Sequence, residues 1–121
     1  MTIIGAGVTL HEALTAAKEL ANEGISARVI DAYSVKPLDA ATISEAVRAT
    51  GGRLVVAEDH WAEGGLGEAV LSALAENGAA DVAYRHLAVR YMPGSGSTAE
   101  LMNEAGIDAE HIKRAAHEVA G

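Results

Sequence analysis

Short apolar runs alternate with amphipathic segments along the whole chain, and this alternation limits the fold more than any other feature. The runs are rich in β-branched residues, and they predict strands at Thr2–Gly5, Ala27–Tyr33, Arg53–Glu58 and Val82–Val89. Strands that alternate with helices pair in parallel, and a parallel sheet is covered by helices on both faces. The sequence therefore predicts a single three-layer α/β/α domain over residues 1–121.

The connections between the strands limit their order in the sheet. Crossovers between parallel strands are right-handed, which favours a mainly parallel sheet of order 2-1-3-4 with the first strand in the middle. Ligands of such folds bind beyond the carboxyl ends of the strands, at the point where the strand order reverses. We expect the loops Gly5–Thr9 and Asp59–Gly65 to meet there and to form a crevice.

Capping signals mark several helix starts. Thr9 and Glu12 have the spacing of a capping box, as do Ser97 and Glu100, and Asp108 is expected to cap the last helix. Apolar residues at helical spacing predict the faces that are turned to the core. These residues are Leu10, Ala13, Leu14, Ala17, Leu20 and Ala21 in the first helix, Ile43, Ala46 and Val47 in the second, Ala69, Val70, Ala73 and Leu74 in the third, and Ile112, Ala115, Ala116 and Val119 in the last.

Composition excludes several classes of protein. The chain has no Phe and no Cys, so its core is aliphatic, and disulfides, thiolate nucleophiles and cysteine-based zinc sites are excluded. The net charge of −8 disfavours nucleic acid, because phosphates would be repelled. No apolar segment approaches the roughly 18 residues that cross a bilayer, and the first residues do not form a signal peptide. We expect no nucleic-acid or membrane partner and a cytoplasmic location.

The segment "EDHWAEGGLGEAV", residues 58–70, combines acids, a histidine and glycines at the end of a strand. This is the place where α/β folds bind ligands, so the segment is a candidate functional site. The predicted crevice or interface consists of ten residues from the two loops. They are Gly5, Gly7, Thr9, Glu58, Asp59, His60, Trp61, Glu63, Gly64 and Gly65.

One hypothesis for the crevice is a regulatory module that binds phosphate or a nucleotide. Gly5 and Gly7 begin a dinucleotide-type turn before a helix, and a helix N-terminus favours phosphate. Asp31 at the end of the second strand stands where an acid would bind ribose. Leu10 occupies the position of the third glycine, however, so the fingerprint is incomplete.

A second hypothesis is acid–base catalysis by His60, whose pKa the neighbouring Asp59 and Glu58 would tune. No serine elbow accompanies it. His60 and Glu63 lack a clear third metal ligand, so no metal site is predicted. The structural alternative is that the acids complement the dipole of the following helix. His86 is expected to be a partly buried strand residue. The remaining histidines, His11, His111 and His117, are expected to lie at the surface.

Several motifs in order resemble the C-terminal domain of transketolases. They are the "GAG" turn, "KPLD", "EDHWAEGGLGEAV" and "PGSGSTAEL", and the resemblance covers essentially the whole chain. The β subunits of 2-oxoacid dehydrogenases and deoxyxylulose-phosphate synthases are similar through the "KPLD" segment. The "EDHWAEGGLGEAV" segment favours transketolase over these two alternatives.

The resemblance implies a three-domain enzyme that uses thiamine diphosphate and a divalent metal, magnesium or calcium. Such an enzyme moves a two-carbon ketol unit from a ketose phosphate to an aldose phosphate. Its sites are built by the two upstream domains across a dimer interface, so no catalytic, cofactor-binding or metal-binding residue carries over to this chain. The isolated chain is expected to be inactive and to support assembly, with Trp61 and Glu63 facing another domain or subunit.

The chain departs from the family pattern at its start. The family has an antiparallel strand before the "GAG" strand, which would pair with Ala27–Tyr33, and this sequence begins directly on the "GAG" strand. We therefore expect an open or intermolecularly paired edge at Ala27–Tyr33. The resemblance then implies a fragment or one part of a split enzyme. Its expected partners are the remaining transketolase domains or an N-terminal subunit, within a homodimer of the full enzyme.

Overall fold

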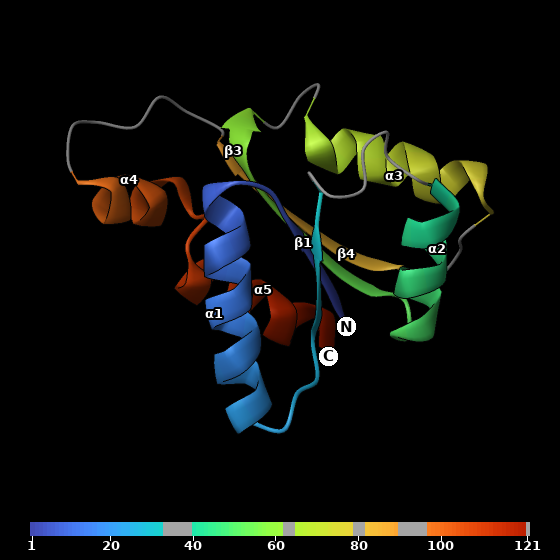
Figure 1. The fold of residues 1–121 in the computed structure, drawn as a ribbon, viewed down its shortest axis with the longest axis horizontal. Coiled ribbons are helices and arrows are strands. Elements are labelled where there is room, and N and C mark those ends of the chain that lie inside the picture. Colours follow the sequence, from blue (N-terminus) through green and yellow to red (C-terminus); the bar gives the residue numbers. More distant parts are fainter. Residues whose placement is uncertain (33–39, 62–64, 79–81, 90–96, 121) are drawn as a thin grey trace.

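The computed structural model describes residues 1–32, 40–61, 65–78, 82–89 and 97–120 (Figure 1). Strands and helices alternate until the fourth strand, after which two helices follow. In chain order the elements are β1 (Thr2–Gly5), α1 (Val8–Asn22), β2 (Arg28–Asp31), α2 (Ala40–Ala49), β3 (Arg53–Trp61), α3 (Leu66–Glu76), β4 (Ala83–Val89), α4 (Thr98–Ala105) and α5 (Ala109–Ala120). Within these ranges, no helix is long and apolar enough to cross a membrane.

The strands form one parallel sheet in the order β2-β1-β3-β4, which confirms the predicted order. β1 lies inside the sheet, where Ile4 is in register with Ile30 on one side and Val56 on the other. β2 forms an edge: in the described part of the chain it pairs with β1 alone, and no antiparallel strand lies beside it. The carboxyl ends of β1 and β3 lie side by side, as the crevice prediction requires.

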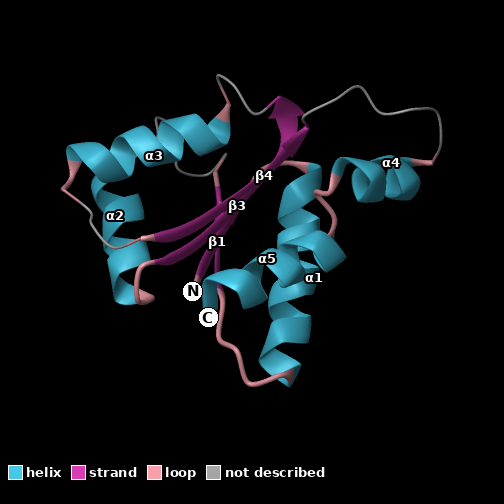
Figure 2. Cartoon of the chain, turned by 180° about the vertical axis from the view of Figure 1, so that it is seen from behind, coloured by secondary structure: helices cyan, strands magenta, loops and turns pink. Residues whose placement is uncertain are grey.

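Helices cover both faces of the sheet (Figures 1 and 2). Successive side chains of a strand point to opposite faces. Ile3 and Val55 therefore pack against α1 and α5 on one face, within a fully buried cluster. Ile4 and Val56 pack against α2 and α3 on the other face. Each cluster fills the space between the sheet and one of the two helix layers, so the three predicted layers are observed.

Small side chains allow α1 and α5 to pack closely against the sheet and against each other. Ala13 and Ala16 of α1 and Ala116 of α5 are fully buried in the same cluster as Ile3. Because alanine carries only a methyl group, a neighbouring backbone can approach closely at each of these positions. Close approach of this kind fills a core that has no large Phe side chains. The aliphatic core expected from composition is thus observed.

The buried face of α1 differs from the expected one. Ala13 and Leu20 are buried as predicted, but Leu14 is 50% exposed, and Thr9 and Ala16 are buried instead. Apolar residues occur on two overlapping faces of this helix, and the face with the smaller side chains packs on the sheet. Ala69 of α3 is likewise exposed, against prediction. The predicted core residues of α2 and α5, and Val70, Ala73 and Leu74 of α3, are buried.

β3 is longer than the sequence predicts. It reaches Trp61 instead of ending at Glu58, with an irregular register against β4 between Ala57 and Trp61. Asp59 therefore lies on the strand rather than in the following loop. β2 is shorter than predicted, because it begins at Arg28 and ends at Asp31. The last predicted residue of that strand, Tyr33, lies outside the described residues.

Candidate functional site

Glu58 is the acid that begins the "EDHWAEGGLGEAV" segment, and its carboxylate caps helix α3. The backbone N–H of Leu66 donates to Oε1 at 2.8 Å, and that of Gly67 donates to Oε2 at 2.6 Å. These N–H groups open the first turn of α3, where no helical carbonyl can accept from them. A carboxylate there also complements the positive end of the helix. The structural alternative for this acid is therefore correct.

His86 of β4 lies against the same carboxylate. Its Nε2 is 2.5 Å from Oε2 of Glu58, and the two side chains are 13% and 3% exposed. Nε2 carries the proton of this hydrogen bond when Glu58 is ionised. His86 is partly buried, as predicted, but its pairing with Glu58 was missed. The register of the two strands explains the contact. Val56 is in register with His86, and Glu58 lies two residues beyond Val56 on the same face of its strand.

Gly67 has a steric role next to this pair. A Cβ placed on Gly67 would overlap the imidazole ring of His86. Gly65, the residue before α3, has φ −103°, which does not require glycine. At the start of α3, the steric requirement for glycine thus falls on Gly67 rather than on Gly65. Gly64 itself lies outside the described residues.

The other wall of the predicted crevice is fastened to β3 by Thr9. Its hydroxyl lies 2.8 Å from the carbonyl oxygens of both Ala57 and Ala6, and it accepts from the N–H of Ala6 at 3.0 Å. The predicted capping box between Thr9 and Glu12 is wrong, because Thr9 lies inside α1 and no side chain caps the helix. The helix starts instead after Gly7, whose φ of 60° suits a glycine.

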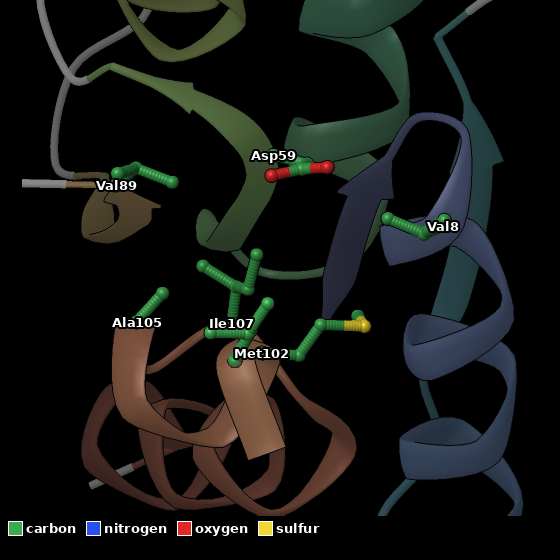
Figure 3. A pocket seen from close by; sticks show the side chains of 7 residues that line it. Val8, Asp59, Val89, Met102, Ala105 and Ile107 are labelled. Carbon is green, nitrogen blue, oxygen red and sulfur yellow. The ribbon is translucent and has the colours of Figure 1, made fainter. Parts of the chain in front are cut away.

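The two walls meet at a pocket of about 200 Å³ beyond the carboxyl ends of the strands (Figure 3). Val8 from the first wall and Asp59 from the second line it, at the sheet end where ligands of such folds bind. Of the ten predicted crevice residues, Asp59 is the one found among the described lining residues. Its other walls come from β4 and from the region of α4, which sequence reasoning missed. The remaining lining residues are Val89, Leu101, Met102, Ala105 and Ile107.

Part of the predicted site lies outside the described residues. The backbone of His60 and Trp61 belongs to β3, but their side chains are outside the described part of the chain, as is Glu63. His60 therefore remains a sequence hypothesis. Over the described residues, no group of three or more His, Cys, Asp or Glu is arranged to hold a metal ion.

The last two helices carry the remaining predicted caps. Ser97 accepts from the backbone N–H of Glu100 and completes the predicted capping box. Asp108 caps α5, because its Oδ1 accepts from the N–H of His111 at 3.1 Å and lies 2.6 Å from Nδ1 of that residue. Burial opposes ionisation of Asp108, but its hydrogen bonds from His111 and Asn103 outweigh it and hold the pKa below the ordinary value.

The three layers, the strand order β2-β1-β3-β4 and the carboxylate-capped start of α3 define an open, parallel α/β/α domain. The family model described as "Transketolase, C-terminal domain" matches residues 1–112, and the chain belongs to this family. The resemblance inferred from the motifs is thereby confirmed.

Similar proteins agree with this assignment. The chain is 53% identical over 112 residues to transketolase-like protein 2 of Mus musculus. The aligned region covers 93% of this chain and 18% of the mouse protein. It is 50% identical over 115 residues to transketolase of Homo sapiens. That aligned region covers 95% of this chain and 18% of the human protein. The chain thus spans about a fifth of the length of these relatives.

A solved structure has the same fold. It is described as a split gene transketolase, inactive beta4 tetramer, and it matches with a TM-score of 0.86 and 35% sequence identity. The match covers 98% of this chain and 38% of that chain. The fold of the described residues is therefore the fold of a transketolase C-terminal domain.

The pocket does not suit the cofactor that the family implies. A diphosphate with its divalent metal needs N–H groups or cations for the phosphates and several oxygen ligands for the metal. The pocket instead offers apolar walls and the single carboxylate of Asp59. The N–H groups of Thr9 and Leu10 at the start of α1 already donate to the carbonyls of Ala6 and Gly7. The described residues of the pocket therefore do not fit the diphosphate or its metal.

Proposed function

We propose that this chain works as the C-terminal domain of an assembled transketolase and is not catalytic by itself. The assembled enzyme transfers a two-carbon ketol unit from a ketose phosphate to an aldose phosphate. The observation that carries the proposal is the geometry of Glu58. Both of its carboxylate oxygens bind the start of α3, and one of them also faces His86. The acid of the segment that looked catalytic thus holds the fold together.

The proposed role is support of the domain and subunit assembly. Thiamine diphosphate and magnesium or calcium would be bound by the remaining transketolase domains or by an N-terminal subunit. The names of the relatives and the chain's share of their length support this division of roles. We further propose a homodimer of the full enzyme, located in the cytoplasm, with Trp61 and Glu63 on the side that faces another domain or subunit.

Calorimetry tests the absence of a cofactor site in this chain. Thiamine diphosphate is titrated with excess Mg²⁺ into the 121-residue chain, with human transketolase as the positive control. We expect no saturable heat for the chain. Micromolar binding to the chain would overturn the proposal that its residues take no part in cofactor binding.

The alternative functions have less support. A phosphate or nucleotide module would need donors at Gly5–Thr9, whereas the described pocket carries a carboxylate. A thermal-shift series with inorganic phosphate, ADP and NAD tests it, and we expect no stabilisation. Membership of a 2-oxoacid dehydrogenase β subunit or a deoxyxylulose-phosphate synthase is disfavoured by 50% identity to human transketolase.

A further inference from the structure

The assembly role proposed above does not require the pocket between the start of α1, the ends of β3 and β4, and α4. Figure 3 shows Asp59 on one side of the space, Val8 and Val89 at opposite flanks, and Met102, Ala105 and Ile107 across from Asp59. The pocket lies where the strand order reverses between β1 and β3. This is the usual ligand position in open parallel sheets.

The size of the pocket limits what can enter. Its volume is about 200 Å³, whereas pockets for drug-sized ligands have about 300–1,000 Å³. The described space is thus too small to enclose a nucleotide. It suits a short aliphatic chain or a single ring.

The lining of the pocket limits the ligand's polarity. Six of the seven lining residues are apolar, and the seventh is Asp59. The Asp59 side chain is exposed, and among the described residues its carboxylate has no hydrogen bond or ion pair. The net charge of the chain is −8, so the surrounding field also favours cations. An apolar body is therefore favoured inside, and a positive group at the edge.

We propose that this pocket binds a small organic cation, with its apolar part between α1 and α4 and its ammonium group beside Asp59. The apolar part removes the exposed side chain of Val8 and the partly exposed side chain of Met102 from water, and it packs against the buried Ile107. The ammonium group stays at the exposed carboxylate and retains part of its hydration. The pocket thus prefers a cation, whereas the phosphate site suggested by the glycine turn would prefer an anion.

Nuclear magnetic resonance on the isotope-labelled 121-residue chain tests the proposal. The probes are hexylammonium, hexanol and hexanoate, which share one apolar chain and differ in charge. We expect saturable shifts of the methyl signals of Val8, Val89 and Ile107, strongest with hexylammonium, weaker with hexanol and absent with hexanoate. Equal binding of hexylammonium and hexanoate, or no saturable shift with hexylammonium, overturns the proposal.

Two variants separate the charge from the cavity. Asp59→Asn keeps the size of the side chain and should weaken hexylammonium binding about two- to five-fold, the range of an exposed ion pair, without changing hexanol binding. Ala105→Leu should fill the space and abolish binding of both. Leu71→Ala, at an exposed apolar residue of α3 on the opposite sheet face, is the control and should change neither. An Asp59→Asn variant that binds hexylammonium as tightly as the wild type overturns the role of the carboxylate.

Discussion

Glu58 of β3, which is buried, and His86 of β4, which is partly buried, form a pair with Nε2 of His86 2.5 Å from Oε2 of Glu58. The same carboxylate oxygen accepts from the backbone N–H of Gly67 in α3. One side chain therefore connects two neighbouring strands with the start of the helix that covers them. This connection explains why an acid ends the apolar run of β3.

Replacing Glu58 should destabilise the domain strongly. In Glu58→Ala, α3 loses its carboxylate cap and the hydrogen bond to His86 is lost, so the free energy of unfolding should fall by about 2–3 kcal/mol. Glu58→Gln should lose less, because its amide oxygen still accepts from one N–H. Urea denaturation followed by circular dichroism measures both. Glu76→Ala, at an exposed acid of the same helix, is the control, and an equal effect of the two alanine variants would contradict the role of Glu58.

Gly67 and His86 should be energetically coupled. Gly67→Ala places a methyl group where the imidazole lies, and such overpacking should reduce stability by about 1–3 kcal/mol. With His86→Ala present, the same change should be much milder, because the ring is gone and alanine is up to about 1 kcal/mol better than glycine in a helix. A double-mutant cycle measures the coupling. Additive effects would show that the contact does not govern this position.

The hydroxyl of Thr9 should contribute to the junction between α1 and β3. Thr9→Val keeps the shape of the side chain but removes the bonds to Ala57 and Ala6, and the loss should be about 1–2 kcal/mol for this fully buried group. Thr15→Val, at an exposed threonine of the same helix, should change stability by less than about 0.5 kcal/mol. Thermal and urea unfolding of the two variants can be compared directly. Similar losses in both would indicate a propensity effect of valine in α1 instead.

The strand order and most of the core could be predicted because they depend on local patterns. Ile4 and Val56 occur in short apolar runs, and Ile112 and Val119 recur at helical spacing, so each local choice agrees with the global fold. The face of α1 was harder to predict, since two faces are apolar. In the structure Ala16 is fully buried, whereas Leu14 on the other apolar face is 50% exposed.

The pairings at the site could not be derived from local pattern. Glu58 and His86 are 28 residues apart, and their contact requires the register of β3 with β4. The pocket wall formed by Leu101 and Met102 requires the position of α4 in space, for which the sequence contains no periodic signal. Thr9 was assigned to a capping box because its spacing fits, but a buried carbonyl of β3 is its actual partner.

Asp108 should make stability depend on pH in the acid range. Its pKa lies below the ordinary value: burial opposes ionisation, but hydrogen bonds from the side chains of His111 and Asn103 and the backbone of His111 outweigh it. Ionised Asp108 therefore stabilises the fold above the unfolded-state pKa of about 3.9, and this contribution is lost as the pH falls through the lower folded-state value.

The measurement for Asp108 is urea unfolding between pH 6 and about pH 2.5, with Asp108→Asn as the comparison. Asparagine keeps a capping oxygen but has no titrating charge. The stability advantage of the wild type over Asp108→Asn should be constant above about pH 5 and shrink below about pH 4. An advantage that grows as the pH falls would contradict the direction of the shift.

The two interpretations of this domain, a supporting role in assembly and acid–base catalysis, differ most in what they predict for His60. We consider a chimera in which this chain replaces the matching 115-residue segment of human transketolase. If His60 were an acid–base catalyst, His60→Ala would lower kcat by about 10²- to 10⁴-fold. If the domain only supports assembly, kcat should fall by less than about tenfold, with any loss visible in thermal stability or in the subunit association measured by ultracentrifugation. His11→Ala, at an exposed histidine of α1, is the matched control. A hundredfold loss of kcat in a folded, fully associated His60→Ala chimera would reject the supporting role and assign the chemistry to this segment.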